Sequence, residues 1–345
     1  MEQYEHGGDI YGNPQVRLDF SVNTNPLGMP PGARAALIAH IDKFMRYPDP
    51  QCRALRAAIA LHEGVPEDWV ICGNGAADLI YRLCFAMKPK KALVCAPTFS
   101  EYERAMKQVG CQVSQHFLKE ENLFLLTEEI LDMLQPGLDM LFLCHPNNPT
   151  GRLIPEELLR HIIKRAQQER ITVVVDECFL EFSGGASSKA YLDEAPCLIV
   201  LKAFTKTYAM AGLRLGYILA SGKEMLGKVK LASQVWSVSV PAQIAGEAAL
   251  EDEGWMQRTR CLIAEERGYL AKGLSQCGAK VYPGDANFLL FQHGKPLYEP
   301  LLQKGIMIRP CGNFEGLDAS YHRVCIKTRE ENIELIKAIK EIIDD

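Results

Sequence analysis

From residue 52 to 232, short apolar runs alternate with stretches whose apolar residues recur at helical spacing. The apolar runs are rich in β-branched residues, which is typical of strands buried on both faces. These predicted strands occupy residues 69–72, 92–96, 140–144, 172–175, 198–201 and 215–220. The predicted helices between them occupy residues 76–87, 101–108, 155–169 and 223–232. The alternation predicts an α/β fold in which helices cover both faces of a mostly parallel central sheet.

The two ends of the chain have a different pattern. Residues 1–30 are rich in Gly, Pro and Asn and are predicted to form an extended N-terminal arm. A helical stretch at 243–276 is followed by shorter apolar runs and a final helix at 330–343. We therefore expect an arm at 1–30, a large domain at 31–239 and a smaller α+β domain at 240–345, with a kink near Pro241.

The charge and composition of the chain argue against several classes of binding partner. The net charge of −5 and the pI of about 6.0 argue against nucleic acid or an anionic membrane as the main partner. The first residues lack an apolar signal core, and no apolar run approaches the ~18 residues of a membrane span. None of the twelve cysteines lies within ten positions of another, so no paired-cysteine metal site is expected. We interpret them as buried small hydrophobes in a cytoplasmic protein.

Two loops after predicted strands carry candidate binding groups. In parallel sheets, ligands bind at the carboxyl ends of the strands. At residues 72–78 a strand ends in a Gly-Asn-Gly turn that begins a helix, and a helix N-terminus offers free N–H groups to an anion. At residues 145–151 two prolines and two asparagines form a polar loop in which Asn148 could bind a ligand. Ordinary turn formation is the alternative for both loops.

Two further strand ends carry charged groups. Asp176 follows three valines, and a buried carboxylate there needs a partner such as a pyridinium N–H; a helix cap or a structural salt bridge is the alternative. Lys206 follows another apolar run, and a desolvated lysine becomes a nucleophile towards aldehydes. Arg214, eight residues further on, could bind a phosphate with two hydrogen bonds. A single lysine is usually a solvated charge, so the interpretation depends on all four sites occurring together.

The four sites, in this order, resemble the fold-type-I pyridoxal-phosphate enzymes of the aspartate aminotransferase superfamily, over essentially the whole chain. The Asn-Asn-Pro-Thr-Gly loop is similar to that of histidinol-phosphate aminotransferases. Threonine-phosphate decarboxylases of cobalamin biosynthesis resemble the chain more closely still.

The resemblance implies a role for each candidate residue. Lys206 would carry the cofactor covalently, and Asp176 would keep the pyridine nitrogen protonated, so that the ring acts as an electron sink. Asn148 would bond the ring 3-oxygen, and Phe99 would stack on the ring. The residues implied to hold the cofactor phosphate are Gly75, Ala76, Ala77, Thr205 and Arg214, with Tyr47 reaching it from the neighbouring subunit of a homodimer. The residues implied to contact the substrate are His6, Gly7, Asn23, Asn148, Arg309 and Arg323.

Decarboxylases and aminotransferases of this superfamily differ in which bond at the substrate Cα stands perpendicular to the cofactor ring. The His-Gly-Gly sequence at 6–8 and the segments 19–28 and 308–318 resemble the decarboxylase. Aminotransferases usually carry Tyr at the position of Phe179, where its hydroxyl adds a hydrogen bond worth roughly 0.5–1.5 kcal/mol. The resemblance thus implies decarboxylation of threonine phosphate, with His6 and Arg309 binding its phosphate and Asn23 and Arg323 near its carboxylate.

Three alternatives remain at this point, one of which is another aminotransferase of the superfamily. A histidinol-phosphate-type aminotransferase shares nearly all of these residues, including an arginine at the Arg309 position. Some transcription regulators also carry an aminotransferase-like domain, but they have a DNA-binding module in front of it, and this chain is acidic.

Overall fold

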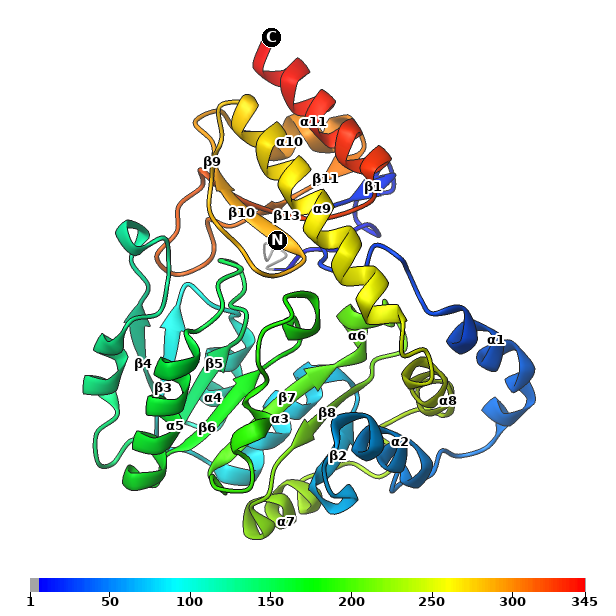
Figure 1. Ribbon diagram of the computed structural model, residues 1–345, viewed down its shortest axis with the longest axis vertical. Helices are drawn as coiled ribbons and strands as arrows, with labels where there is room; N and C mark the ends of the chain where they lie inside the picture. The colour runs from blue at the N-terminus through cyan, green and yellow to red at the C-terminus, as the bar shows by residue number, and fades with distance from the viewer. Residues whose placement is uncertain (1–5, 345) are drawn as a thin grey trace.

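The computed structural model describes residues 6–344 and contains a large part and a small part, each built on its own sheet (Figure 1). The large part holds a seven-stranded sheet in the order β2-β8-β7-β6-β5-β3-β4. Its strands are β2 (Val70–Gly73), β3 (Lys91–Ala96), β4 (Gln112–Phe117), β5 (Met140–Cys144), β6 (Thr172–Asp176), β7 (Leu198–Ala203) and β8 (Gly216–Leu219). Strand β8 runs antiparallel to both of its neighbours, β2 and β7, and the other strand pairs are parallel, so the predicted α/β fold with a mostly parallel sheet is confirmed.

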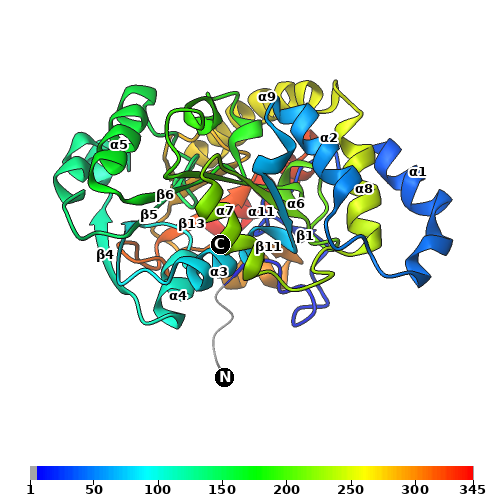
Figure 2. The ribbon, with the colours of Figure 1, turned by 90° about the horizontal axis from the view of Figure 1, so that it is seen from below.

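Helices cover both faces of this sheet because the side chains of its strands alternate between two apolar layers. Val174 lies in one layer with apolar residues of α3 (Gly75–Met87), α4 (Glu101–Gln108) and α7 (Lys223–Leu231). Val173 and Val175 lie in the other layer with residues of α2 (Arg53–Glu63) and α5 (Glu156–Glu169). Figure 2 shows α3 and α4 on the side of the sheet opposite to α2 and α5.

The small part is a four-stranded antiparallel sheet in the order β12-β13-β10-β9. Its strands are β9 (Lys280–Val281), β10 (Phe288–Gln292), β12 (Arg309–Pro310) and β13 (Tyr321–Cys325), and its helices are α9 (Trp255–Gln276), α10 (Tyr298–Gln303) and α11 (Arg329–Asp344). The N-terminal arm joins it, because β1 (Leu18–Asp19) pairs in parallel with β11 (Ile306–Met307). Residues from both ends of the chain are thereby held together above the large sheet.

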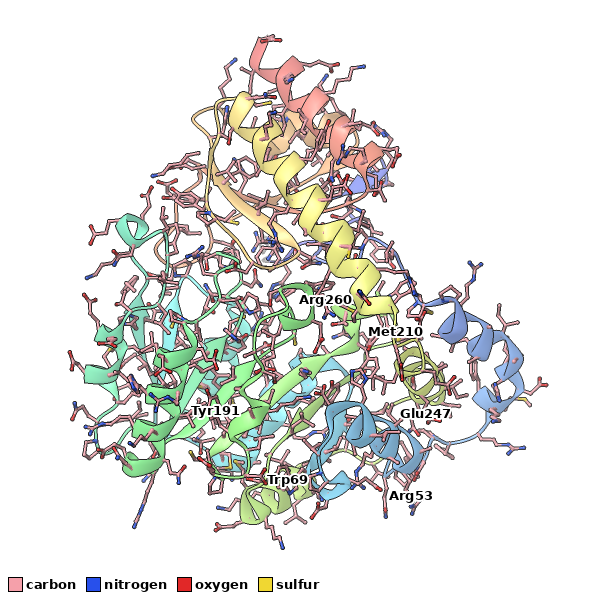
Figure 3. All side chains as sticks on the ribbon, in the orientation of Figure 1. Arg53, Trp69, Tyr191, Met210, Glu247 and Arg260 are labelled. Atoms are coloured by element: carbon pink, nitrogen blue, oxygen red, sulfur yellow. The ribbon has the colours of Figure 1, made fainter. Side chains whose placement is uncertain are left out.

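The predicted helix at 243–276 is in fact two helices, α8 (Val240–Leu250) and α9. The break lies at residues 251–254, which are three acidic residues and a glycine and carry no apolar periodicity. Helix α8 packs on α1 (Pro31–Ala39) and α2, whereas α9 crosses to the small part. Arg260 of α9 donates a hydrogen bond to the Glu181 carbonyl at 3.5 Å, where α9 passes the large part (Figure 3). The domain boundaries given above remain a prediction.

Several short elements complete the chain. They are η1 (Ile41–Met45), η2 (Glu67–Trp69), η3 (Glu120–Asn122), η4 (Glu128–Met133), η5 (Leu180–Phe182), η6 (Ser188–Tyr191) and α6 (Phe204–Thr207). Ten of the twelve cysteines are buried, as expected, and all twelve are free. Over residues 6–344, none of the helices is both long and apolar enough to cross a membrane.

Candidate active site

The carboxyl ends of β5, β6 and β7 open into a cavity of about 580 Å³. Its lining combines the large part, the β12–β13 edge of the small part and the N-terminal arm. Thirteen of the fifteen residues predicted for the site line it: His6, Gly7, Asn23, Ala76, Ala77, Phe99, Asn148, Asp176, Thr205, Lys206, Arg214, Arg309 and Arg323. The fold therefore brings together, from both ends of the chain, most of the residues that the sequence singled out.

Asp176 is the last residue of β6 and is buried at the bottom of the cavity. Its Oδ1 accepts a hydrogen bond from the backbone N–H of Cys178 at 2.9 Å, and its Oδ2 accepts one from the Tyr102 hydroxyl at 2.6 Å. Burial raises the pKa of the Asp176 carboxyl, and these two donors oppose the rise. A cationic N–H in the cavity would compensate the buried carboxylate.

Lys206 lies on α6, directly after β7, and its side chain enters the cavity. Its Nζ makes no hydrogen bond or ion pair with the residues that the structure describes. Burial lowers the pKa of Lys206, and the positive charge of Arg323 lowers it further. A larger share of the amine is thus neutral and nucleophilic than for a solvated lysine.

An anion site lies at the N-terminus of α3. No side chain caps this helix, so the N–H groups of Ala76 and Ala77 are directed towards the cavity, beside Thr205 and Arg214. Gly75 lies next to this anion site but does not line the cavity. Its φ is +81°, and a Cβ there would lie 2.8 Å from Arg214 Nη2, so only glycine lets the guanidinium approach this closely.

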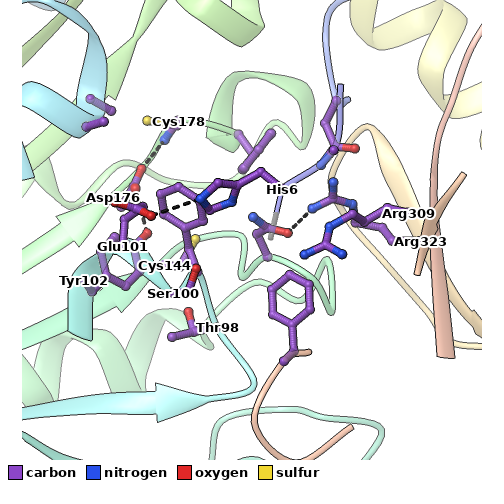
Figure 4. A pocket seen from close by; sticks show the side chains of 18 of the residues that line it. His6, Thr98, Ser100, Glu101, Tyr102, Cys144, Asp176, Cys178, Arg309 and Arg323 are labelled. Atoms are coloured by element: carbon purple, nitrogen blue, oxygen red, sulfur yellow. Dashed lines mark hydrogen bonds and ion pairs between the residues drawn. The ribbon is translucent and has the colours of Figure 1, made fainter. Parts of the chain in front are cut away.

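Arg323, on β13, lies in the wall of the cavity opposite Asp176 (Figure 4). One of its Nη groups donates to Asn148 Oδ1, and the other donates to the Ser21 carbonyl at 2.8 Å. Its Nε and the Oδ1 of Asn23 are buried and have no partner among residues 6–344. Burial lowers the pKa of Arg323 to about 10, which leaves it charged at neutral pH. The wall therefore holds polar atoms without a protein partner, which a bound ligand or water can satisfy.

The remaining substrate candidates surround this wall. Arg309 is buried on β12, donates to Asn313 Oδ1 at 2.8 Å and lies over the Phe314 ring at 5.1 Å. The His6 ring lies 5.9 Å from the Phe99 ring, and its Nε2 is 3.0 Å from Glu101 Oε1. Figure 4 shows His6 between the Asp176 side and the arginine side of the cavity.

Tyr47 is outside this cavity. It is 79% exposed, and its ring stacks on Trp236 at 4.5 Å. Among the lining residues that the sequence did not single out are Glu101 and Tyr102. Both lie at the start of α4, two and three residues after Phe99, so proximity to a predicted site residue was the signal that could have found them.

Three features of the cavity fit pyridoxal 5′-phosphate. The buried amine of Lys206 suits its aldehyde, the carboxylate of Asp176 suits its ring nitrogen, and the anion site at the N-terminus of α3 suits its phosphate. The fold and this cavity therefore define a pyridoxal-phosphate enzyme of fold type I. The family model described as "Aminotransferase class I and II" matches residues 16–339, and the chain belongs to that family. Its cofactor is pyridoxal 5′-phosphate, as in the family.

Individual relatives with two different activities are similar to the chain. The threonine-phosphate decarboxylase of Salmonella typhimurium is 39% identical over 98% of this chain and 96% of its own length. The histidinol-phosphate aminotransferase of Desulfitobacterium hafniense (strain DCB-2) is 38% identical over 95% of this chain and 92% of its own. The crystal structure of the histidinol-phosphate aminotransferase from Clostridium acetobutylicum superposes with a TM-score of 0.88 at 32% identity, covering 95% of this chain and 99% of that one.

Proposed function

We propose that this protein decarboxylates L-threonine O-3-phosphate to (R)-1-amino-2-propanol O-2-phosphate, the reaction of the threonine-phosphate decarboxylases of cobalamin biosynthesis. Phe179 supports the choice of reaction, and the pair Arg309 and Arg323, which are register partners on β12 and β13 and both line the cavity, supports the kind of substrate. Two adjacent cations suit a small substrate that carries two anionic groups, here a phosphate and a carboxylate. The 39% identity to the Salmonella typhimurium decarboxylase is in line with this proposal.

The residues of the cavity have separate tasks in this reaction. Arg309 and His6 bind the substrate phosphate, while Arg323 and Asn23 lie near its carboxylate. Bound pyridoxal 5′-phosphate supplies an electron sink for whichever Cα bond stands perpendicular to its ring. Because the two arginines hold the two anionic groups, they decide which bond that is.

Two residues would hold or transfer protons in this reaction. Asp176 holds the proton on the pyridine nitrogen. Lys206 lines the same cavity, and its Nζ would supply the proton that the substrate carbon needs after losing CO₂.

Phe179 also favours decarboxylation. It lines the cavity as a buried ring, packed edge-on against Phe288 at 5.1 Å. If Asn148 binds the 3-oxygen of the cofactor ring, that oxygen would therefore accept no hydrogen bond from a tyrosine hydroxyl at position 179. An aminotransferase using histidinol phosphate is the second candidate, because relatives with that name are nearly as similar to the chain.

The two candidates give different products from purified protein. With O-phosphothreonine alone, we expect CO₂ and 1-amino-2-propanol phosphate in equal amounts over many turnovers. With histidinol phosphate and 2-oxoglutarate, we expect no glutamate. Glutamate in the second assay together with no CO₂ in the first would establish the aminotransferase instead.

We also infer a homodimer in which Tyr47 reaches the cofactor phosphate of the neighbouring subunit. Its support is an exposed apolar patch around the Tyr47–Trp236 stack: Ile38, Ile41, Phe44, Met45, Tyr47, Val235 and Trp236. Sedimentation should give twice the chain mass of 38.5 kDa, and Trp236→Glu should lower it towards a monomer. A monomeric wild-type protein that binds the cofactor fully would contradict this inference.

A further inference from the structure

The carboxylate of Asp176 is held by two donors from different elements. The backbone N–H of Cys178 bonds Oδ1 at 2.9 Å, and the hydroxyl of Tyr102 on α4 bonds Oδ2 at 2.6 Å. One donor on each oxygen fixes the plane of the carboxylate. Each oxygen keeps a further lone pair, and the side chain lines the cavity, so it can accept a hydrogen bond from a bound ring.

Tyr102 is itself rigidly placed. Its side chain is fully buried, although its ring reaches the cavity wall. The ring stacks on Phe142 at 5.1 Å with an interplanar angle of 13°, and Phe99 packs edge-on against it at 5.6 Å. Because these contacts allow little rotation, its hydroxyl is directed at one carboxylate oxygen.

The surroundings of Asp176 make this donor important. The titratable groups that face the carboxylate are Tyr102 on α4, Cys144 on β5 and Cys178 beyond β6, and Lys206 lines the same cavity. Burial raises the pKa of both thiols and of the Tyr102 hydroxyl, so all three stay neutral. Burial likewise favours the protonated form of Asp176, and hydrogen bonds to the charged form oppose it.

We propose that Tyr102 is a positioning residue for the cofactor, whose buried hydroxyl keeps the Asp176 carboxylate oriented and anionic opposite the pyridine nitrogen. Without this donor, Asp176 gains proton affinity and draws the shared proton away from the ring. A ring nitrogen that is less protonated withdraws fewer electrons. The Lys206 nitrogen joined to the cofactor then becomes more basic. This role is independent of whether the enzyme decarboxylates or transaminates.

The test is the pH dependence of the absorption of the bound cofactor, measured without substrate in wild type, Tyr102→Phe and Tyr81→Phe. Tyr81 is the matched control because its hydroxyl donates to Glu101 at 2.9 Å rather than to Asp176. Loss of one hydrogen bond to a charged group should move the midpoint in Tyr102→Phe upward by about half a pH unit or more. Tyr81→Phe should titrate like wild type. Equal midpoints in wild type and Tyr102→Phe would overturn the proposal.

A second measurement separates this role from general packing. Wild type and Tyr102→Phe are each reconstituted with a cofactor analogue in which CH replaces the pyridine nitrogen. Because Tyr102 acts through that nitrogen, the two proteins should titrate alike with the analogue and differ only with pyridoxal 5′-phosphate. A midpoint difference that persists with the analogue would show that Tyr102 acts by packing alone, and would overturn the proposal.

Discussion

Arg309 and Arg323 face each other across β12 and β13, and their side chains line the same cavity. Two like charges opposite each other on a sheet are unfavourable unless an anion lies between or beside them. Strands β12 and β13 of the small part thus place two cations in the cavity, where both can contact a bound anion.

Replacing Arg309 by Gln should raise KM for O-phosphothreonine about 10- to 100-fold, because one or two charge-assisted hydrogen bonds are lost. Steady-state kinetics measure this. Arg160→Gln is the control, since Arg160 lies on α5 in an exposed ion pair with Glu157. An unchanged KM in Arg309→Gln would mean that the substrate phosphate binds elsewhere.

Lys206→Ala should abolish covalent cofactor attachment. After borohydride treatment, peptide mass mapping of the wild type should find the cofactor on Lys206, and the variant should carry none. Lys228→Ala, which removes an exposed lysine of α7, should retain the label. Covalent cofactor on any other lysine of the variant would contradict the assignment.

Gly75→Ala tests the anion site. A Cβ at φ +81° is strained and would displace the Arg214 guanidinium, so we expect the dissociation constant of pyridoxal 5′-phosphate to rise about tenfold or more. Equilibrium dialysis of the apoprotein measures it. Gly110→Ala has similar strain, at φ +77°, but no atom within 4 Å of its Cβ. If both variants bind the cofactor like wild type, Arg214 does not hold its phosphate.

An ionic cluster around the buried Glu63 determines how the stability of the protein depends on acid. Glu63 accepts hydrogen bonds from Lys202 at 2.8 Å and Lys189 at 2.7 Å. Burial alone would raise the pKa of Glu63, but the two lysines outweigh it and hold the pKa at about 2, below its usual 4.5. A depressed pKa contributes stability that is complete above about pH 4.5 and is lost as the pH falls towards 2, worth about 3 kcal/mol.

Glu63→Gln should therefore be less stable than wild type by about 3 kcal/mol at pH 7, because Lys189 and Lys202 lose the carboxylate that both of them bond, and Lys202 is left with Glu181 at 2.8 Å. The deficit should shrink as the pH falls from 5 to 3. Urea unfolding followed by circular dichroism at several pH values tests both statements. A deficit that is constant with pH would mean that the charge of Glu63 does not stabilise the fold.

The sequence was sufficient for six of the seven strands of the large sheet and for the residues at their ends, because a parallel sheet brings the carboxyl ends of its strands to one edge. This is how Asn148, Asp176 and Lys206 could be grouped without a structure. Strand β4 was missed because it lies at the edge of the sheet, where polar and apolar residues alternate weakly. The hydrogen bond from Tyr102 to Asp176 joins residues 74 positions apart, and no periodicity in the sequence encodes such a contact.

The most direct test of the proposed reaction is mass spectrometry of the product formed from O-phosphothreonine in D₂O with no 2-oxo acid present. The account predicts 1-amino-2-propanol phosphate with one deuterium on the carbon that lost CO₂, formed over many turnovers and absent with Lys206→Ala. A 2-oxo acid phosphate formed once per active site, with its amino group left on the enzyme, would contradict it and identify an aminotransferase.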